Sequence, residues 1–345
     1  MLGGGIYVTQ DKTLPGAYLN FINASSAGST IGDRGVVAIA LPINKVAGSV
    51  IELTKADFVN NCSDILGKAY DSKDVAALRE IFCNAAKVYL YDLGTDKKVA
   101  DAVKALEAYD FNILCAYSKE AADITAYITA VKGWRDEMGK KCQVVVYNQT
   151  NPDHEGVINV VTTVSDDGAD AHALVAWVAG VEAGCKIQES CTNKLYDGEY
   201  NVVADKSQSE LAACIENGQI ALHQVYGEIR LLEDINSLTT TNADKGDDFK
   251  SNQTIRVIDQ IANDIAKLFN TKYLGRIPNT AAGRALLWGE IVKHHMELER
   301  VGAIENFDSS LLTIAKGENK KSVVVNDAIT VTNAMSQLYM TVVIQ

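Results

Sequence analysis

The best candidate for catalytic or metal-binding chemistry is the segment His294–Arg300, which reads HHMELER. In a helix His294 lies near Glu297, and His295 lies near Glu299, because residues three and four apart share a face. Each pair offers an imidazole and a carboxylate, which are common metal ligands. The zinc pattern HExxH is absent, and no third ligand can be named. We therefore expect a solvated helix face and predict no metal site.

Two further histidines could act as general bases. His172 lies on an apolar helix pattern, and His154 stands between two acidic residues. Neither is accompanied by a nucleophile motif, which favours a structural or surface role. The acidic pairs at 166–167 and 247–248 lie in polar, loop-like contexts, where solvation and helix capping account for carboxylates. We predict no catalytic residue.

The motifs that bind nucleotides or activate a serine are missing. Gly67-Lys68 is followed by Ala69 instead of Ser or Thr, and Cys62 stands where a Walker A loop requires its first glycine. No GxGxxG leads from a strand into a helix, and no GxSxG occurs. We therefore predict that the protein uses no cofactor and is not an enzyme.

The composition of the chain limits the classes of molecule that it can be expected to bind. The chain has 345 residues, enough for two or three domains, and its 47% hydrophobic and 22% charged residues are typical of a folded protein. A net charge of −12 repels phosphate backbones, so we expect no nucleic-acid partner. No secretory signal or membrane-length apolar run occurs, which predicts a cytoplasmic protein without direct membrane insertion. The seven cysteines lack paired spacing and are expected to be reduced and mostly buried.

The first two thirds of the chain are predicted to form a small β-rich module followed by an α/β domain. Residues 30–88 read as a small β-rich module, with strands at 36–40 and 49–53 and a helix at 72–84. Beyond it, apolar runs alternate with helical periods, which predicts an α/β domain with a buried, largely parallel sheet. Its strands are expected at 87–92, 112–117, 143–147, 157–164, 219–226 and 228–232, and its helices at 96–109, 119–138, 169–182 and 209–216, the last capped by Ser207.

A polar loop over 239–248 introduces a different part of the chain. Two amphipathic helices are expected at 249–270 and 280–301, separated by Gly275 and Pro278. Short strands are then predicted at 311–315, 322–325, 328–331 and 338–344.

The two ends of the sequence carry β-prone segments without an evident hairpin partner. Residues 338–344 contain no charge, proline or glycine, so an unpaired strand there would template pairing with other chains. Two interpretations stay open on physical grounds: both ends complete a sheet of their own subunit, or they complete a sheet of a neighbour.

Four stretches resemble the contractile phage tail sheath family, the short sheath subunits of phages and phage-like bacteriocins. They are MLGGGIYVTQ (1–10), LPGAYLNF (14–21), LEDINSLT (232–239) and MSQLYMTVV (335–343). The resemblance implies a multidomain α/β protein. Its parts would be an N-terminal arm (1–22), a small β-sandwich (23–88), an α/β domain of subtilisin-like topology without protease function (89–235), an α+β C-terminal domain (236–330) and a C-terminal arm (331–345).

The same resemblance implies a structural subunit that stacks as hexameric rings around a tail tube and contracts to drive the tube through a target cell envelope. Its partners would be copies of itself, the tail tube protein, and baseplate and tail terminator proteins. Assembly would take place in the bacterial cytoplasm, before the tail is released with its particle. The residues expected to exchange strands between subunits are Ile6, Tyr7, Val8, Thr9, Leu338, Tyr339, Met340, Thr341, Val342 and Val343.

Two alternatives predict different behaviour. A soluble α/β hydrolase-like enzyme would need a pocket with catalytic groups, which the sequence does not supply. A binding module whose terminal strands pair within its own sheets would stay monomeric at high concentration.

Overall fold

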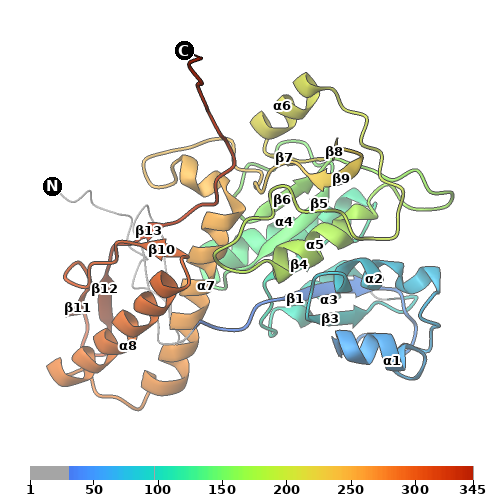
Figure 1. Ribbon diagram of the computed structural model, residues 1–345. Helices are drawn as coiled ribbons and strands as arrows, with labels where there is room; N and C mark the ends of the chain where they lie inside the picture. Colours follow the sequence, from blue (N-terminus) through green and yellow to red (C-terminus); the bar gives the residue numbers. More distant parts are fainter. Residues whose placement is uncertain (1–30, 97, 345) are drawn as a thin grey trace.

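A seven-stranded sheet lies at the centre of the molecule (Figure 1). The structure is a computed structural model that describes residues 31–96 and 98–344. The strand order is β2-β3-β1-β4-β5-β6-β7, with β2 antiparallel to β3 and the other strands parallel. The strands are β1 (Val36–Leu41), β2 (Val50–Thr54), β3 (Lys87–Asp92), β4 (Ile113–Cys115), β5 (Gln143–Tyr147), β6 (Val157–Val160) and β7 (Gln219–Ile220). The predicted parallel sheet of an α/β protein is confirmed.

Helices cover both faces of this sheet, and the alternation of side chains along β1 shows how. Val37 and Ile39 belong to the core beneath α2 and α5, whereas Ala38 and Ala40 belong to the core beneath α3 and α4. Because β1 is buried on both sides, it needs the near-continuous apolar run that its sequence provides. The covering helices are α2 (Ala76–Phe82), α3 (Val99–Leu106), α4 (Ala121–Gly133) and α5 (Leu174–Gly184).

Helix α5 is enclosed on every side. All its residues from Leu174 to Ala183 are buried, as expected of a helix that is apolar around its whole circumference. At Gly180 the backbone of α2 comes so close that an added Cβ would lie 2.4 Å from the carbonyl oxygen of Ile81. Only glycine permits this approach without displacing α2.

The prediction of a separate β-rich module before residue 89 is wrong for the described part of that range. Strands β1 and β2 both hydrogen-bond to β3, and β1 also pairs with β4, so these strands belong to the central sheet. Gly32, Gly35, Pro42 and Gly48, which separate the predicted strands of this range, lie in the segments that flank β1. One of these segments folds over Asp92, whose carboxylate accepts hydrogen bonds from four backbone N–H groups, those of Asn44, Lys45, Val46 and Gly94. Helix α1 (Lys55–Leu66) follows β2 and begins at a capping box formed by Thr54 and Asp57.

The last part of the α/β region carries smaller elements. Helix α6 (Gln208–Glu216) begins at the predicted cap, where the Ser207 side chain accepts a hydrogen bond from the Glu210 N–H. The single strand expected over 219–226 is divided into β7 and β8 (Leu222–Val225). Strand β8 forms an antiparallel hairpin with β9 (Glu228–Leu231), and both residues of its turn, Tyr226 and Gly227, have positive φ.

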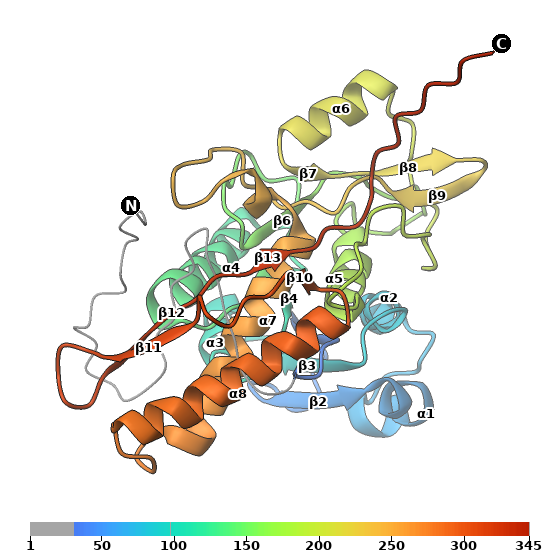
Figure 2. The ribbon, with the colours of Figure 1, turned by 60° about the vertical axis from the view of Figure 1, so that its left-hand side comes forward.

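Two long helices and short strands form the part that follows (Figure 2). Helices α7 (Asn252–Leu268) and α8 (Ala281–Arg300) lie within the two predicted helical ranges and share an apolar core. Strands β11 (Thr313–Lys316) and β12 (Val323–Asn326) form one antiparallel pair, and β10 (Ile304–Glu305) and β13 (Thr330–Val331) form another. None of the helices in the described residues is both long enough and apolar enough to span a bilayer.

Candidate functional site

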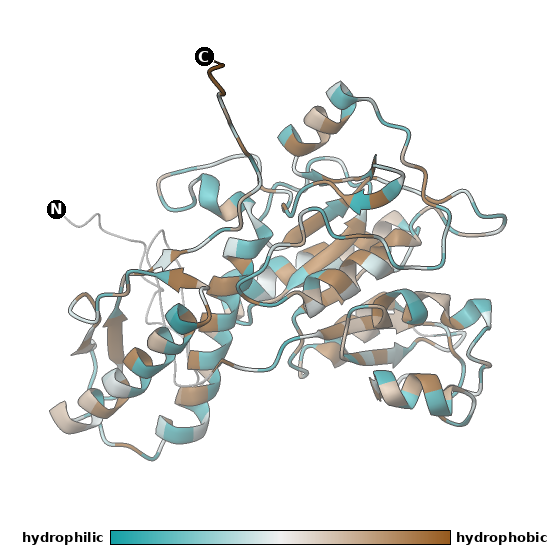
Figure 3. Cartoon of the chain, in the orientation of Figure 1, coloured by the Kyte–Doolittle hydropathy of each residue, from teal (hydrophilic) through white to brown (hydrophobic). Residues whose placement is uncertain are grey.

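Residues 335–344 form a tail that leaves the packed part of the molecule (Figures 1 and 2). Its large side chains are almost fully exposed: Leu338 is 86% exposed, Tyr339 88% and Ile344 93%. Within the described residues this segment forms no strand, although its composition predicts one. Figure 3 shows its end as strongly apolar. A strand-forming, uncharged segment is thus exposed to solvent without a partner from its own described chain.

The residues just before the tail are held firmly. The Thr332 N–H donates to the carbonyl oxygen of Ala303 at 3.1 Å. The side chain of Gln253 donates to the Thr332 carbonyl at 3.3 Å and accepts from the Ala334 N–H at 2.9 Å. Asn333 contacts the hydroxyl of Thr254. The N-terminal turn of α7 therefore anchors the root of the tail up to residue 334.

Among the described residues, the β-sheets near this root have open edges. Strands β11 and β12 pair only with each other among the described residues, and so do β10 and β13. The outer edge of each pair presents backbone groups that an added strand could use. Of the residues predicted to exchange strands, Ile6, Tyr7, Val8 and Thr9 lie outside the described residues, so their positions are not part of this geometry.

The predicted partners of His294 and His295 are wrong. Both side chains are fully buried and meet aspartates from other elements: His294 Nε2 lies 3.1 Å from Asp264 Oδ2, and His295 Nε2 lies 3.2 Å from Asp327 Oδ2. Glu297 pairs with Arg300 instead. Helical spacing predicts which residues lie on neighbouring positions of a face, but it does not show that both histidines are buried and that aspartates from other elements reach them.

These histidine–aspartate pairs connect elements that lie apart in the sequence. Burial, with the neighbouring His295, lowers the pKa of His294 to about 3, while burial raises the pKa of Asp264 to about 6. Asp264 also accepts hydrogen bonds from the Gly32 N–H and from Gln260. The pair thus joins α7, α8 and the segment that enters β1.

The other candidate bases have structural surroundings as well. His154 accepts the Gly156 N–H at its Nδ1 and has its Nε2 3.2 Å from Asp136. The ring of His172 packs edge-on against Tyr117, with centroids 4.6 Å apart. Asp166 accepts from the backbone and side chain of Asn201, and Asp247 pairs with Lys250. None of these contacts places a base against a nucleophile.

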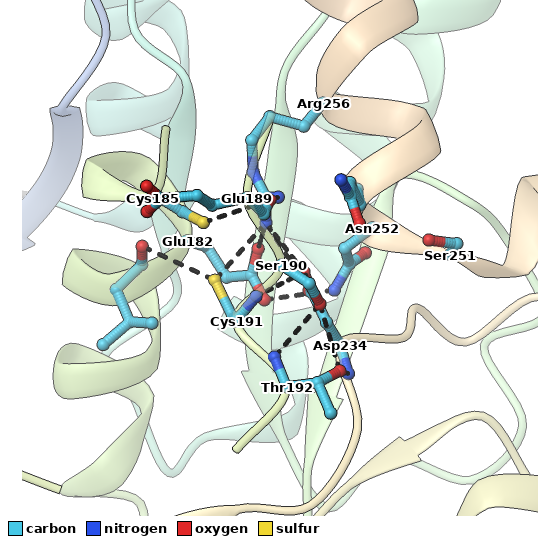
Figure 4. Close-up of polar contacts among 12 residues, drawn as sticks. Glu182, Cys185, Glu189, Ser190, Cys191, Thr192, Asp234, Ser251, Asn252 and Arg256 are labelled. Atoms are coloured by element: carbon cyan, nitrogen blue, oxygen red, sulfur yellow. Dashed lines mark hydrogen bonds and ion pairs between the residues drawn. The ribbon is translucent and has the colours of Figure 1, made fainter. Parts of the chain in front are cut away.

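A buried ionic cluster joins the α/β region to α7 (Figure 4). Arg256 Nη2 lies 2.7 Å from Glu182 Oε2 and 3.1 Å from Asp234 Oδ2, and all three side chains are at most 2% exposed. Burial and the neighbouring Asp234 raise the pKa of Glu182. Burial opposes ionisation of Asp234 too, but Arg256 holds the pKa of Asp234 below its usual value. Of the two carboxylates around the guanidinium, Asp234 is therefore the one that ionises more readily and Glu182 the one that more readily keeps a proton.

Two groups of ligand-type side chains lie close enough to hold a metal: Asp136, His154 and Glu155, and Glu182, Cys191 and Asp234. Each group already contains a cation. Arg135 Nε lies 3.8 Å from Glu155 Oε1, and Arg256 donates to both acids of the second group. A guanidinium in this position supplies the positive charge that the carboxylates need, and it opposes the entry of a metal cation.

No motif in the sequence predicts this cluster. One signal was present: Glu182 is the sole charged residue in the apolar run 174–184, and a lone charge in a fully buried helix requires a partner. Its partner could not be named from the sequence, because Arg256 lies on a helix in a different part of the chain.

Comparison with known proteins gives concordant matches. A model of the phage tail sheath protein central domain matches residues 94–237, and a model of the phage tail sheath C-terminal domain matches residues 244–345. The chain is 30% identical over 224 residues to the tail sheath protein of Clostridium phage phiCD119, a match that covers 64% of this chain and 62% of the relative. It is 28% identical over 267 residues to the phage-like element PBSX protein XkdK of Bacillus subtilis, covering 72% of this chain and 57% of the relative. The chain thus spans about 60% of the length of these curated relatives.

Solved structures show the same fold. A crystal structure of the sheath tail protein from Desulfitobacterium hafniense matches with a TM-score of 0.75 and 23% identity, over 92% of this chain and 100% of that chain. The helical sheath of the anti-feeding prophage in its contracted state matches with a TM-score of 0.71 and 14% identity, over 96% of this chain and 99% of that chain.

Proposed function

The chain belongs to the phage tail sheath family, and on this premise we propose that it is a structural subunit of a contractile tail sheath. Subunits would stack as hexameric rings around a tail tube, and contraction would drive the tube through the envelope of a target cell. The fold match to a contracted anti-feeding prophage sheath supports this assignment. In this proposal the α/β domain has a subtilisin-like topology that serves as scaffold and has no protease function.

The observation that carries the proposal is the exposed apolar tail. Residues 338–344 carry no charge and lie in solvent, next to a root that α7 holds in place. Such a segment is a hazard for a protein that stays monomeric, because it templates pairing with other chains. It is useful in a subunit whose neighbours supply a sheet edge. Within residues 31–96 and 98–344, the short sheets beside α8 leave edges of this kind unpaired.

Strand exchange at both ends would make the assembly strong through repetition. We propose that Leu338–Val343 and Ile6–Thr9 join a sheet in the C-terminal domain of a neighbour. One backbone hydrogen bond contributes only about 0.5–1.5 kcal/mol net, so a strand of a few residues is weak alone. Every subunit would donate and receive strands, so that the contacts act multivalently. Rings could then rotate during contraction without separating.

The same proposal defines the partners and the location. They are copies of this chain, a tail tube protein, and baseplate and tail terminator proteins. Nucleic acid is not among them, since the charge is −12. Assembly would take place in the bacterial cytoplasm, and the finished sheath would be part of the released tail. A soluble α/β hydrolase-like enzyme, the alternative, has no support from the surroundings of the histidines described above.

Deleting residues 338–345 tests the proposal. We expect the truncated protein to keep its circular dichroism spectrum, because the one side-chain bond described within the tail joins Tyr339 to Gln337. We expect it to lose the ability to form polymers, measured by sedimentation and electron microscopy. Thr341→Pro is a milder variant that removes one N–H and disrupts a strand ladder.

Tyr226→Ser is the matched control, because Tyr226 is fully exposed at the tip of the β8–β9 hairpin and is also aromatic. This variant should polymerise normally, which would separate strand exchange from a general effect of removing exposed apolar surface. Normal polymers from the truncated protein would refute strand exchange by the tail. Loss of its fold would show that the tail pairs within its own subunit.

A further inference from the structure

We propose that Gln253 is a positioning residue for strand exchange, whose side-chain amide fixes the point and the direction at which the tail leaves the subunit. This inference rests on the proposed function, because it takes the tail to join a sheet of a neighbour. Gln253 is the second residue of α7 and is only 2% exposed. Its amide is therefore a buried polar group that needs hydrogen-bond partners within the protein.

This single amide binds two segments of the chain. Its Nε2 group donates to the Gln188 carbonyl at 3.1 Å and to the Thr332 carbonyl at 3.3 Å, and its Oε1 accepts the Ala334 N–H at 2.9 Å. A glutamine amide has two donor hydrogens, so both are used here. A carbonyl oxygen and the N–H two residues later are groups that a neighbouring antiparallel strand would bind. The Gln253 side chain thus takes the place of a partner strand at the root of the tail, residues 332–334.

The ordered part of the chain ends directly after this contact. Val331 packs against the apolar core around Leu238 and Phe249. Asn333 Oδ1 accepts from the hydroxyl groups of Ser251 and Thr254, at 3.2 Å and 3.3 Å. From residue 335 to residue 344 every side chain is exposed. The part of the tail that is free to pair with another chain therefore begins at residue 335.

A fixed root lowers the entropic cost of strand exchange. Ordering a backbone residue during association costs conformational entropy. Residues 332–334 are already ordered in the single subunit, so a neighbour has to order only the residues beyond them. A free root would also point the tail in directions from which it cannot reach a neighbour's sheet. We therefore expect that loss of the Gln253 amide weakens assembly and leaves the fold intact.

The hydrogen bond to Gln188 links the tail to the α/β region as well. Gln188 lies in the turn that follows α5, and the next carbonyl of this turn, that of Glu189, accepts from Arg256 Nη1 at 2.9 Å. Arg256 is one helical turn beyond Gln253 and belongs to the buried ionic cluster with Glu182 and Asp234. A pull on the tail by a neighbour would thus be transmitted through Gln253 to this buried turn, and not to β13 alone.

Hydrogen exchange in the unpolymerised full-length protein tests the contact itself, independently of assembly. In Gln253→Leu the Ala334 N–H loses its acceptor, so we expect it to exchange at least about tenfold faster than in the wild type. Gln260→Leu is the matched control, because Gln260 is another buried glutamine of α7 that binds Gly32 and Asp264 instead of the tail. It should leave exchange at Ala334 unchanged. Equal exchange at Ala334 in Gln253→Leu and the wild type would overturn the proposed contact.

The critical concentration for polymerisation, measured by sedimentation, tests the positioning role. We expect Gln253→Leu to raise it at least about tenfold while the circular dichroism spectrum is retained. Asn333→Ala should raise it by a smaller factor, and because Asn333 is exposed this variant carries the test if Gln253→Leu does not fold. Wild-type critical concentrations in both variants would overturn the positioning role and leave strand exchange intact.

Failure of the proposed function gives a different result. Normal polymers from the protein that lacks residues 338–345 would overturn strand exchange by the tail, and with it the role of Gln253 in assembly. Exchange at Ala334 would still decide whether Gln253 holds the root, because that measurement needs no polymer.

Discussion

Replacing Arg256 by alanine is expected to lower the free energy of unfolding by about 3–5 kcal/mol, the usual cost of removing one partner from a buried ion pair. The side chain is 1% exposed and holds two carboxylates, with its Nη2 2.7 Å from Glu182 and 3.1 Å from Asp234. Its Nη1 also donates to the Glu189 carbonyl. Alanine supplies none of these contacts.

The magnitude follows from what remains after the substitution. Glu182 and Asp234 would face each other in a site without water access, and two like charges there cannot both persist. One carboxylate would take up a proton, which limits the penalty to a few kcal/mol. The lost hydrogen bond to the Glu189 carbonyl adds about 1 kcal/mol.

The assay is urea unfolding of the unpolymerised protein, followed by circular dichroism. Arg300→Ala is the control, because Arg300 forms an ion pair with Glu297 on an exposed surface, and it should leave stability unchanged within error. Adding Glu182→Gln to Arg256→Ala should recover part of the loss, since it removes one of the two facing charges.

The pH dependence tests the electrostatic reason itself. In Arg256→Ala the folded state should bind one more proton than the unfolded state near neutral pH. Its stability should then rise as the pH falls from 7 to 5. If Arg256→Ala were as stable as Arg300→Ala, or if it lost the same free energy of unfolding at pH 7 and at pH 5, this reasoning would be refuted.

Two further predictions concern buried aspartates. Between pH 3.8 and about 6 the folded His294–Asp264 pair holds one proton on the aspartate, and the unfolded pair holds one proton on the histidine. Both states bind the same number of protons, so the pair does not make the free energy of unfolding depend on pH in this range. Asp264→Asn should make stability fall with decreasing pH, by up to about 1.4 kcal/mol per unit in urea unfolding; an unchanged slope would contradict this. Asp92→Asn replaces one oxygen that accepts two backbone N–H groups, and should cost about 1–3 kcal/mol at pH 7. Because those bonds lower the pKa of Asp92, its contribution fades below pH 3.8, and a variant that is equally destabilised at lower pH would be inconsistent with it.

Much of the fold was predictable from local pattern. The strand at 87–92 and the helix cap at Ser207 were placed correctly, because apolar runs and capping residues act over a few neighbours. The membership of β1 and β2 in the central sheet was not predictable in this way. Strands β1 and β2 belong with β3, a fact that depends on pairing between segments far apart in the sequence.

Part of the candidate site, too, was predictable from the sequence and part was not. Composition alone marked residues 338–344 as a strand in need of a partner. The structure leaves this segment exposed and forms no strand from it, so its pairing with a neighbour stays a prediction. Only the tertiary structure showed that its root is fastened to α7.

Helical spacing gave His294 and His295 neighbours three and four residues away, because spacing reports which residues share a face. It does not report which face is buried. The partners that the structure assigns, Asp264 and Asp327, lie 30 and 32 residues from these histidines, and Arg256 lies 74 residues from Glu182. Short-range periodicity determines the elements of this protein from its sequence, whereas the burial of charge is decided only when distant elements pack against one another.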